Sequence, residues 1–448
     1  MNNFENLKNI LVLAAQQAGI DKYEIYYQSG SDISAETLKH ELSNFSFGTT
    51  SGICFRCVIN GKVGYASTEL MNEEEMYELV RRAATNARFI DTDSQGIIFK
   101  GSDSYGTKTS EHVSLPDVSA LKETALELQN QNYRQGDCVT DGTQSVMMAY
   151  EIETKICNSE GLNLSNKASM SGGYSYIIIN KDGEPSYGIR FAKGCNIDQF
   201  SDISKQAYEL ALSKLNAGEV ETGTYDIIIS GEQMRNLLSA FWSVFSSKSV
   251  RLGTSLLADK VGESVASECV TIVDDPFDPQ CNVQTTFDAE GVAVYKKDII
   301  KDGVLKTFLY NLSEAALAKA ESTANAYKGS YADTVGIRPY CFSIQPGTYD
   351  LEELFGIIGD GIYITETKGL HAGTNEQTGD FSIESAGFIV KGGKKLGAVK
   401  SFTISGNFYD LLKNITHIEN KVDYGFSGSL NVFASPSVLI RNISVAGK

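Results

Sequence analysis

Carboxylates in the second half of the chain are the first candidates for chemistry. Asp274 and Asp275 are adjacent, Asp288 and Glu290 lie in the run FDAEG, and Asp380 lies in the run TGDFS. Two or three such groups that converge in space could hold Mg²⁺ or Ca²⁺, or act as an acid–base pair. Acidic residues before proline or glycine also form turns, so a purely structural role is the alternative.

Histidines and cysteines do not form a recognisable metal-binding motif. His40 and Glu41 resemble the start of a zinc-binding helix, but no second histidine follows where the other ligand would stand. Cys54 and Cys57 lie in a run that alternates like a strand, so their thiols should point to opposite faces. We therefore expect free thiols in a reducing compartment. The remaining histidines are isolated as well: His112, His371 and His417.

The charge of the chain argues against direct contact with nucleic acid. The formal net charge is −17, and the longest basic cluster, Lys391 to Lys400, has the pattern of a hairpin turn. Binding to phosphates needs clustered Lys and Arg. The glycine-rich run at Gly387 lacks the spacing of a phosphate loop, and no G-x-S-x-G motif marks a catalytic serine.

Apolar runs are short throughout the chain. The first, from Ile10 to Ala15, is too short for the core of an export signal, and its surroundings repeat at helical spacing instead. A membrane helix needs about 20 apolar residues, and no stretch approaches that length. These features predict a cytoplasmic protein without a membrane segment.

Turn residues between alternating apolar runs predict hairpins. Asn60-Gly61 and Asp182-Gly183 each supply the positive φ angles of a two-residue turn, and Asp302-Gly303 repeats the pattern. A helix is expected after each hairpin, which hints at internal duplication. The expected helices are near 4–17, after Asn72 with Glu75 closing a capping box, at about 202–215, and after Asn311 with Glu314.

The second half of the chain is rich in strands. Runs such as GIYITETKG and GDFSIESAGFIVKGG alternate or are enriched in β-branched residues, with a short helix expected at 409–415. We predict an α+β fold whose N-terminal domain, 1–220, consists of antiparallel hairpins with helices, with a subdivision near 91–115. The C-terminal domain, 221–448, should be a strand-rich, mostly antiparallel sheet or barrel-like unit.

The run NLLSAFWSVFSSKSVRLGTSLLADKVGE, from Asn236 to Glu263, contains the only tryptophan. It carries an apolar stripe at helical spacing, so a packed core helix explains it without any function. Serines fall on the other side of this helix. The stripe consists of Met234, Leu237, Leu238, Phe241 and Phe245.

This run, with several others, makes the chain recognisable. SLLADKVGESV, DDPFDPQCNVQTTFDAEGV, DGVLKTFLYN, QTGDFSIESAGFIVKGG and PSVLIRNISVAG occur in an order and spacing that resemble the TldD/PmbA family, historically labelled modulators of DNA gyrase. The resemblance extends from about residue 15 to the C-terminus. TldD-type members look like zinc peptidases, with an HExxxH helix after a strand such as YDIIIS and a distant cysteine as third protein ligand.

The resemblance also implies what this chain lacks. The two histidine positions fall on Ser239 and Val244, and the glutamate position falls on Ala240. No cysteine occurs after Cys341, so the third ligand has no counterpart. The chain is similar to the PmbA/TldE-type members, which resemble non-catalytic partners of the zinc-bearing subunit.

The leading hypothesis is a PmbA/TldE-like subunit of a TldD/TldE-type zinc metallopeptidase that cleaves peptides or unfolded proteins. It would bind a TldD-like subunit or a second copy of itself, and only the TldD-like partner would hold zinc. An exposed strand edge could bind an extended peptide at Gly379, Asp380, Phe381 and Ser382.

Two alternatives remain open. One is a stand-alone hydrolase in which Asp288, Glu290 and Asp380 bind a cation. The other is a non-enzymatic protein that regulates a partner.

Overall fold

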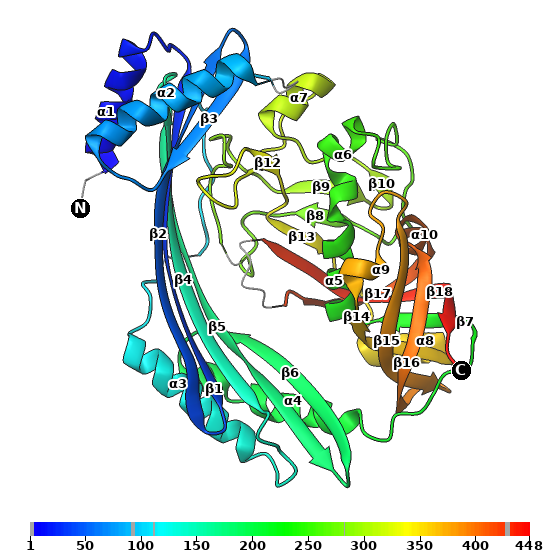
Figure 1. The fold of residues 1–448 in the computed structure, drawn as a ribbon. Helices are drawn as coiled ribbons and strands as arrows, with labels where there is room; N and C mark the ends of the chain where they lie inside the picture. Colours follow the sequence, from blue (N-terminus) through cyan, green and yellow to red (C-terminus); the bar gives the residue numbers. More distant parts are fainter. Residues whose placement is uncertain (1–3, 91–94, 111–112, 282, 426–430) are drawn as a thin grey trace.

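The computed structural model describes residues 4–90, 95–110, 113–281, 283–425 and 431–448. Two bodies face each other: a long curved sheet with helices, formed by the N-terminal half, and a C-terminal body built around a barrel (Figure 1). The predicted α+β class is confirmed. Within these ranges no helix is both long enough and apolar enough to cross a membrane.

The N-terminal sheet has six strands in the order β3-β2-β1-β4-β5-β6, and every neighbouring pair is antiparallel. Helices α1 and α2 pack at one end of the sheet, and α3 and α4 pack at the other (Figure 1). The strands are β1 (Tyr23–Leu38), β2 (Glu41–Ile59), β3 (Lys62–Thr68), β4 (Gln144–Asn158), β5 (Asn163–Lys181) and β6 (Glu184–Lys193). The helices are α1 (Phe4–Gln17), α2 (Glu73–Phe89), α3 (Val118–Tyr133), η1 (Ile197–Phe200) and α4 (Ile203–Ser213).

This sheet is internally repeated. Each half runs helix, three-stranded meander, helix, and the halves join through the antiparallel pair β1–β4. The predicted turns are present: Asn60 and Gly61 have φ of 51° and 78°, and Asp182 and Gly183 have φ of 55° and 86°. Two of the three predicted hairpin-and-helix units are therefore equivalent, whereas the Asp302-Gly303 hairpin belongs to the other sheet.

Five strands of the C-terminal body form a closed ring. Each strand pairs with the next in the order β18-β16-β15-β14-β7, and β7 pairs again with β18. All these pairs are antiparallel except β14–β7, so the barrel-like expectation is confirmed. The five are β7 (Gly223–Ile229), β14 (Gly361–Lys368), β15 (Asp380–Lys391), β16 (Lys394–Asn407) and β18 (Val432–Ala446).

The other strands extend this ring. β17 pairs with β18, and β13, β8, β9 and β10 continue the sheet from β18, with β13–β18 parallel. These strands are β8 (Ile272–Asp274), β9 (Lys297–Lys301), β10 (Val304–Leu305), β13 (Cys341–Ile344) and β17 (Ile415–Asp423), with a separate pair β11 (Ala326–Tyr327) and β12 (Gly336–Ile337). The helices are α5 (Gly231–Phe241), η2 (Trp242–Phe245), α6 (Ser247–Arg251), α7 (Leu312–Ala318), α8 (Leu351–Ile358), α9 (Leu370–Gly373) and α10 (Phe408–Asn414).

Helix α5 is packed into the main core, as its apolar stripe predicts. The stripe residues of α5 and η2 are fully buried, and the ring of Phe241 stacks on that of Phe408 with centroids 4.7 Å apart. The same core includes residues from β7, β14, β16 and β18. The closed ring therefore fixes where the exposed side of α5 points.

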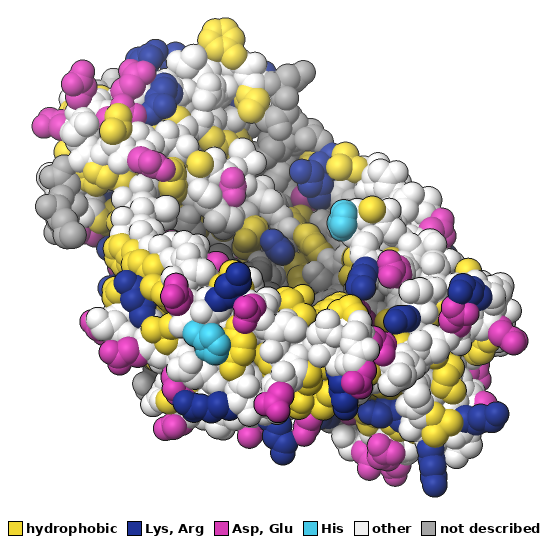
Figure 2. All heavy atoms as spheres, turned by 60° about the horizontal axis from the view of Figure 1, so that its bottom comes forward, with side chains coloured by type: hydrophobic (Ala, Val, Ile, Leu, Met, Phe, Trp, Pro, Cys, Tyr) yellow, Lys and Arg dark blue, Asp and Glu magenta, His cyan; other side chains and the backbone are white. Residues whose placement is uncertain are grey.

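The two bodies meet through buried polar contacts. Arg56 of β2 donates to Glu24 of β1 at 2.9 Å and to Glu290 of the C-terminal body at 3.0 Å, and all three side chains are buried. Residues 95–110, predicted as a polar connection, run along the C-terminal body, where Tyr105 Oη donates to the Gly291 carbonyl. Figure 2 shows the surface hollowed between the bodies, with charges of both signs interspersed on this face.

Replacing Phe241 by Ala should destabilise the protein by about 3–5 kcal/mol, because it removes a buried ring from the main core. The free energy of unfolding in urea measures this. Phe89→Ala is the matched control: Phe89 is 83% exposed, so the same change there should alter stability by about 0.5 kcal/mol or less. Equal effects of the two substitutions would contradict this packing.

Candidate functional site

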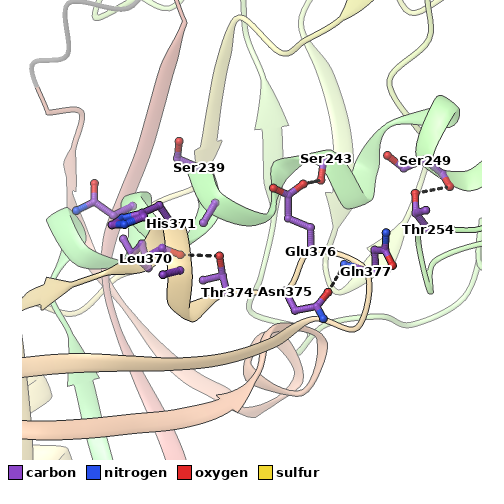
Figure 3. Close-up of a pocket in the computed structure, with 13 residues that line it drawn as sticks. Ser239, Ser243, Ser249, Thr254, Leu370, His371, Thr374, Asn375, Glu376 and Gln377 are labelled. Carbon is purple, nitrogen blue, oxygen red and sulfur yellow. Dashed lines mark hydrogen bonds between the residues drawn. The ribbon is translucent and has the colours of Figure 1, made fainter.

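An open pocket of about 1180 Å³ lies between α5 and the segment 370–377 (Figure 3). Helix α5 follows directly from the barrel strand β7, and the Ser230 hydroxyl caps its first turn. Ser239 and Ala240, on the solvent side of α5, line the pocket. The pocket is lined by Asn236, Ser239, Ala240, Ser243, Ser249, Thr254, Leu370, His371, Ala372, Thr374, Asn375, Glu376 and Gln377.

The lining consists mainly of neutral hydrogen-bonding groups. It includes hydroxyl and amide side chains, with one imidazole, His371, and one carboxylate, Glu376. The Ser243 hydroxyl donates to the Glu376 carboxylate, which joins the two walls (Figure 3). Such a lining can hydrogen-bond an uncharged polar ligand on several sides.

The residues present do not fit the zinc site that the resemblance associates with this helix. Of the three corresponding positions, Ser239 and Ala240 face the pocket, but Val244 is 1% exposed and belongs to the core. In the described part of the chain, no three His, Cys, Asp or Glu side chains gather closely enough to hold a metal ion. A catalytic zinc site needs three protein ligands of these types, so we derive no step through zinc for this chain.

The strand edge expected near Gly379 is covered at Phe381 by the segment that forms the pocket wall. Asp380, Phe381 and Ser382 pair with β16 on one side, and Phe381 also forms a bridge with Thr374 on the other. Hydrogen bonds from Asn407 and Thr378 hold the pKa of the exposed Asp380 carboxyl below its ordinary value. These residues anchor the segment that forms the pocket wall.

Gly379 has a specific structural role at this anchor. Its φ is 82°, and a Cβ there would lie 2.6 Å from the Tyr409 ring, so only glycine fits. Whether Gly379, Asp380, Phe381 and Ser382 contribute to a substrate groove stays a prediction. The structure instead places His371 and Glu376 on the pocket wall, which sequence reasoning missed. Their only sequence signal is the polar run HAGTNEQ before the TGDFS motif.

The candidate carboxylates are engaged in separate structural contacts. Asp288 accepts hydrogen bonds from the backbone N–H groups of Glu290, Val292 and Ala326, at 2.9, 3.0 and 3.1 Å. Glu290 binds Arg56 and accepts from the Leu312 N–H at the start of α7. The structure therefore does not assemble Asp288, Glu290 and Asp380 into one cation site.

The adjacent pair has similar roles. Asp274 is buried, forms an ion pair with Lys297 at 3.2 Å, and accepts from Asn325 Nδ2 at 2.7 Å. Asp275 forms an ion pair with Lys296 at 3.1 Å and accepts from the Phe277 N–H. Turn formation and buried ion pairs explain these carboxylates, which agrees with the alternative of a purely structural role.

The other sequence candidates are dispersed. His40 stacks on Tyr133 with ring centroids 3.8 Å apart, His417 lies at the edge of Tyr349, and His112 lies outside the described residues. Cys54 and Cys57 are free and buried in two different clusters, so the prediction that they point to opposite faces is confirmed. Burial raises the pKa of the Cys57 thiol to about 11.

Comparisons with known proteins agree with the fold. Residues 222–447 match the family described as PmbA/TldA metallopeptidase C-terminal domain, and residues 23–87 match domain 1 of the same family. Metalloprotease PmbA of Escherichia coli O157:H7 is 24% identical over 99% of this chain and 96% of its own length.

Two solved structures share the fold over nearly the whole chain. A Thermotoga maritima protein, described as a proposed modulator of a DNA gyrase, has a TM-score of 0.89 and 27% identity, and the match covers 99% of this chain and 100% of that one. TldE of Thermococcus kodakarensis has a TM-score of 0.88 and 22% identity, covering 98% and 100%.

The stability of the protein should respond to the titration of Asp288. Burial and the charge of Glu290 raise the pKa of Asp288 to about 8 from an ordinary value of 3.8. The folded state then binds more protons than the unfolded state between these values, so Asp288 lowers stability as pH rises through this window. Asp288→Asn should flatten the fall of Tm between pH 6 and 9, measured by calorimetry.

Asp380→Asn is the control for this experiment, because Asp380 is exposed and its pKa is lowered. It should leave the pH dependence above pH 6 unchanged. A wild-type slope retained in Asp288→Asn would contradict the assignment.

Proposed function

The chain belongs to the PmbA/TldD family of metallopeptidases, and on this premise we propose that it is the zinc-free subunit of a two-component cytoplasmic peptidase. Its partner would be a TldD-like subunit that carries zinc, and the substrates would be peptides or unfolded proteins. One observation carries the proposal: the pocket beside α5 presents Ser239 and Ala240 where a zinc subunit would present ligands.

The chemistry of the pocket supports binding without hydrolysis. Hydrolysis of a peptide bond needs a water activated by a metal, or a nucleophile activated by a base. The neutral donors and acceptors of the lining are suited to peptide amides, which are uncharged and need both kinds of group. In this proposal the chain shapes and lines a substrate cavity, and the partner supplies the reaction.

The form of the assembly follows from the relation between the subunits. Related chains usually associate through equivalent surfaces, and two-fold arrangements are the most common closed ones. We therefore propose a two-fold or pseudo-two-fold dimer. A regulatory role without catalysis is a second candidate, which the description of the Thermotoga maritima relative favours.

The purified chain should contain much less than one zinc per chain, because the donor set beside α5 is incomplete. Elemental analysis after purification without chelators measures this. One zinc per chain, retained after dialysis, would contradict the proposal.

The chain alone should not cleave a fluorogenic peptide or casein, and a mixture with a TldD-like subunit should be active. Ala240→Trp, which fills the pocket, should reduce the activity of the mixture at least about fivefold, a loss of roughly 1 kcal/mol. Leu396→Trp is the matched control, because Leu396 is exposed in the β15–β16 hairpin, away from the pocket lining.

Size measurement by light scattering completes this experiment. We expect Ala240→Trp to form the dimer with the partner as the wild type does. The loss of activity would then come from the filled cavity and not from failed assembly. Activity of the isolated chain that survives chelation would overturn the proposal.

A further inference from the structure

A second, smaller cavity lies where the N-terminal sheet meets the C-terminal body. Its volume is about 90 Å³, which is room for a few water molecules or one small polyatomic ion. Residues of β1, β4 and β5 line one side, including Tyr26 and Thr154. The other side is lined by residues of the C-terminal body: Val283, Thr285, residues 287–289, residues 326–328, Tyr340 and Asn431.

Lys328 is the unusual residue of this cavity. It is 5% exposed, and its Nζ lies over the Tyr26 ring at 4.5 Å from the centroid. It also interacts electrostatically with Glu24 and with the Cys54 thiol. Among the described residues, no carboxylate oxygen lies within 4.0 Å of Lys328 Nζ. Its ammonium contacts the Tyr26 ring and hydrogen-bonds the Cys54 thiol, which are both weak acceptors.

The nearby carboxylates already accept hydrogen bonds from other groups. Arg56 donates to both Glu24 and Glu290, and the second oxygen of Glu290 accepts from the Leu312 N–H. Asp288 accepts from three backbone N–H groups. A ring face and a thiol are weaker partners for an ammonium than an oxygen acceptor. An oxyanion inside the cavity would give Lys328 such an acceptor.

We propose that this cavity binds a small oxyanion, a carboxylate or a phosphate, through the ammonium of Lys328 and the hydroxyls of Thr154 and Tyr340. The arrangement offers one cation and several neutral donors, the usual composition of a site for a small anion. Burial raises the pKa of the Tyr340 phenol, which therefore stays a donor. The site lies between the two bodies, so occupancy would stabilise their contact.

The Asp288 carboxyl also lines the cavity. Burial and the neighbouring Glu290 raise its pKa, and both of its oxygens accept backbone N–H groups. This site is independent of the pocket beside α5, and the proposal does not rest on the proposed function.

The test uses the full chain with sodium phosphate or sodium acetate as probes, at constant ionic strength set with NaCl. We expect a saturable rise of Tm of at least about 2 °C with one or both anions, because a ligand of the folded state stabilises it. A response to phosphate alone or to acetate alone identifies the anion class. No response to either would overturn the proposal.

The variants assign the response to the cavity. Lys328→Gln should abolish the rise of Tm, and Thr154→Val should weaken binding at least about fivefold by calorimetry. Lys395→Gln is the matched control, because Lys395 also lies over an aromatic ring, that of Phe388, but is exposed. It should keep the wild-type response.

If Lys328→Gln does not fold, the anion titrations of Thr154→Val and Lys395→Gln test the site without it. Equal affinity in Thr154→Val and wild type would then overturn the site. An unchanged response in a folded Lys328→Gln would do the same, and would mean that Lys328 only balances the charge of Glu24.

Discussion

The buried guanidinium of Arg56 is the interaction on which the arrangement of the two bodies depends. It lies on β2 and is held by Glu24 of the neighbouring strand and Glu290 of the C-terminal body. The free energy needed to remove three charges from water exceeds the stabilisation from a single ion pair. The cluster is therefore stable only when every partner is present. Glu290 also caps the start of α7 through Leu312. Loss of Glu290 would thus leave Arg56 with one carboxylate and the Leu312 N–H without its acceptor, although Asn311 would still cap α7.

The closed ring of strands fixes the position of the pocket, just as Arg56 fixes the contact between the two bodies. Because β7 pairs with both β14 and β18, its end has a fixed position, and α5 must start there. The buried stripe of α5 then sets which side chains face outward. Ser239 faces the pocket as a geometric consequence, and the anchor at Gly379 places the opposite wall.

Local features such as turns and helix caps could be predicted from the sequence, but contacts between residues far apart in the chain could not. The turns at Asn60 and Asp182 and the caps at Asn72 and Asn311 follow from residue types within four positions, and all are present. How far the edge of β15 near Phe381 is covered depends on Thr374 and β14, which the strand itself does not encode. Arg56 was missed for the same reason, since its partner Glu290 lies 234 residues away.

Strand length and site assembly show the same limit. β2 begins at Glu41, well before its apolar run, because its polar first half is held by pairing with β1 and not by burial. The spacing of Asp288 and Asp380 in the sequence could not show whether the two carboxylates converge in space. In the structure each of them has its own hydrogen-bond partners.

The packing of the helix beside the pocket bears directly on the zinc site that the resemblance associates with it. Helix α5 ends at Phe241 and the chain continues as the short η2 turn, so residue 244 follows a different helical path from Ser239. Val244 packs in the main core at 1% exposure. A histidine there would bury a polar ring among apolar side chains, at a cost of about 1–3 kcal/mol without a partner. Substitutions at the exposed Ser239 and the half-buried Ala240 alone would leave the second histidine position, Val244, inside the core. The packing of this helix therefore opposes a zinc site as firmly as its sequence does.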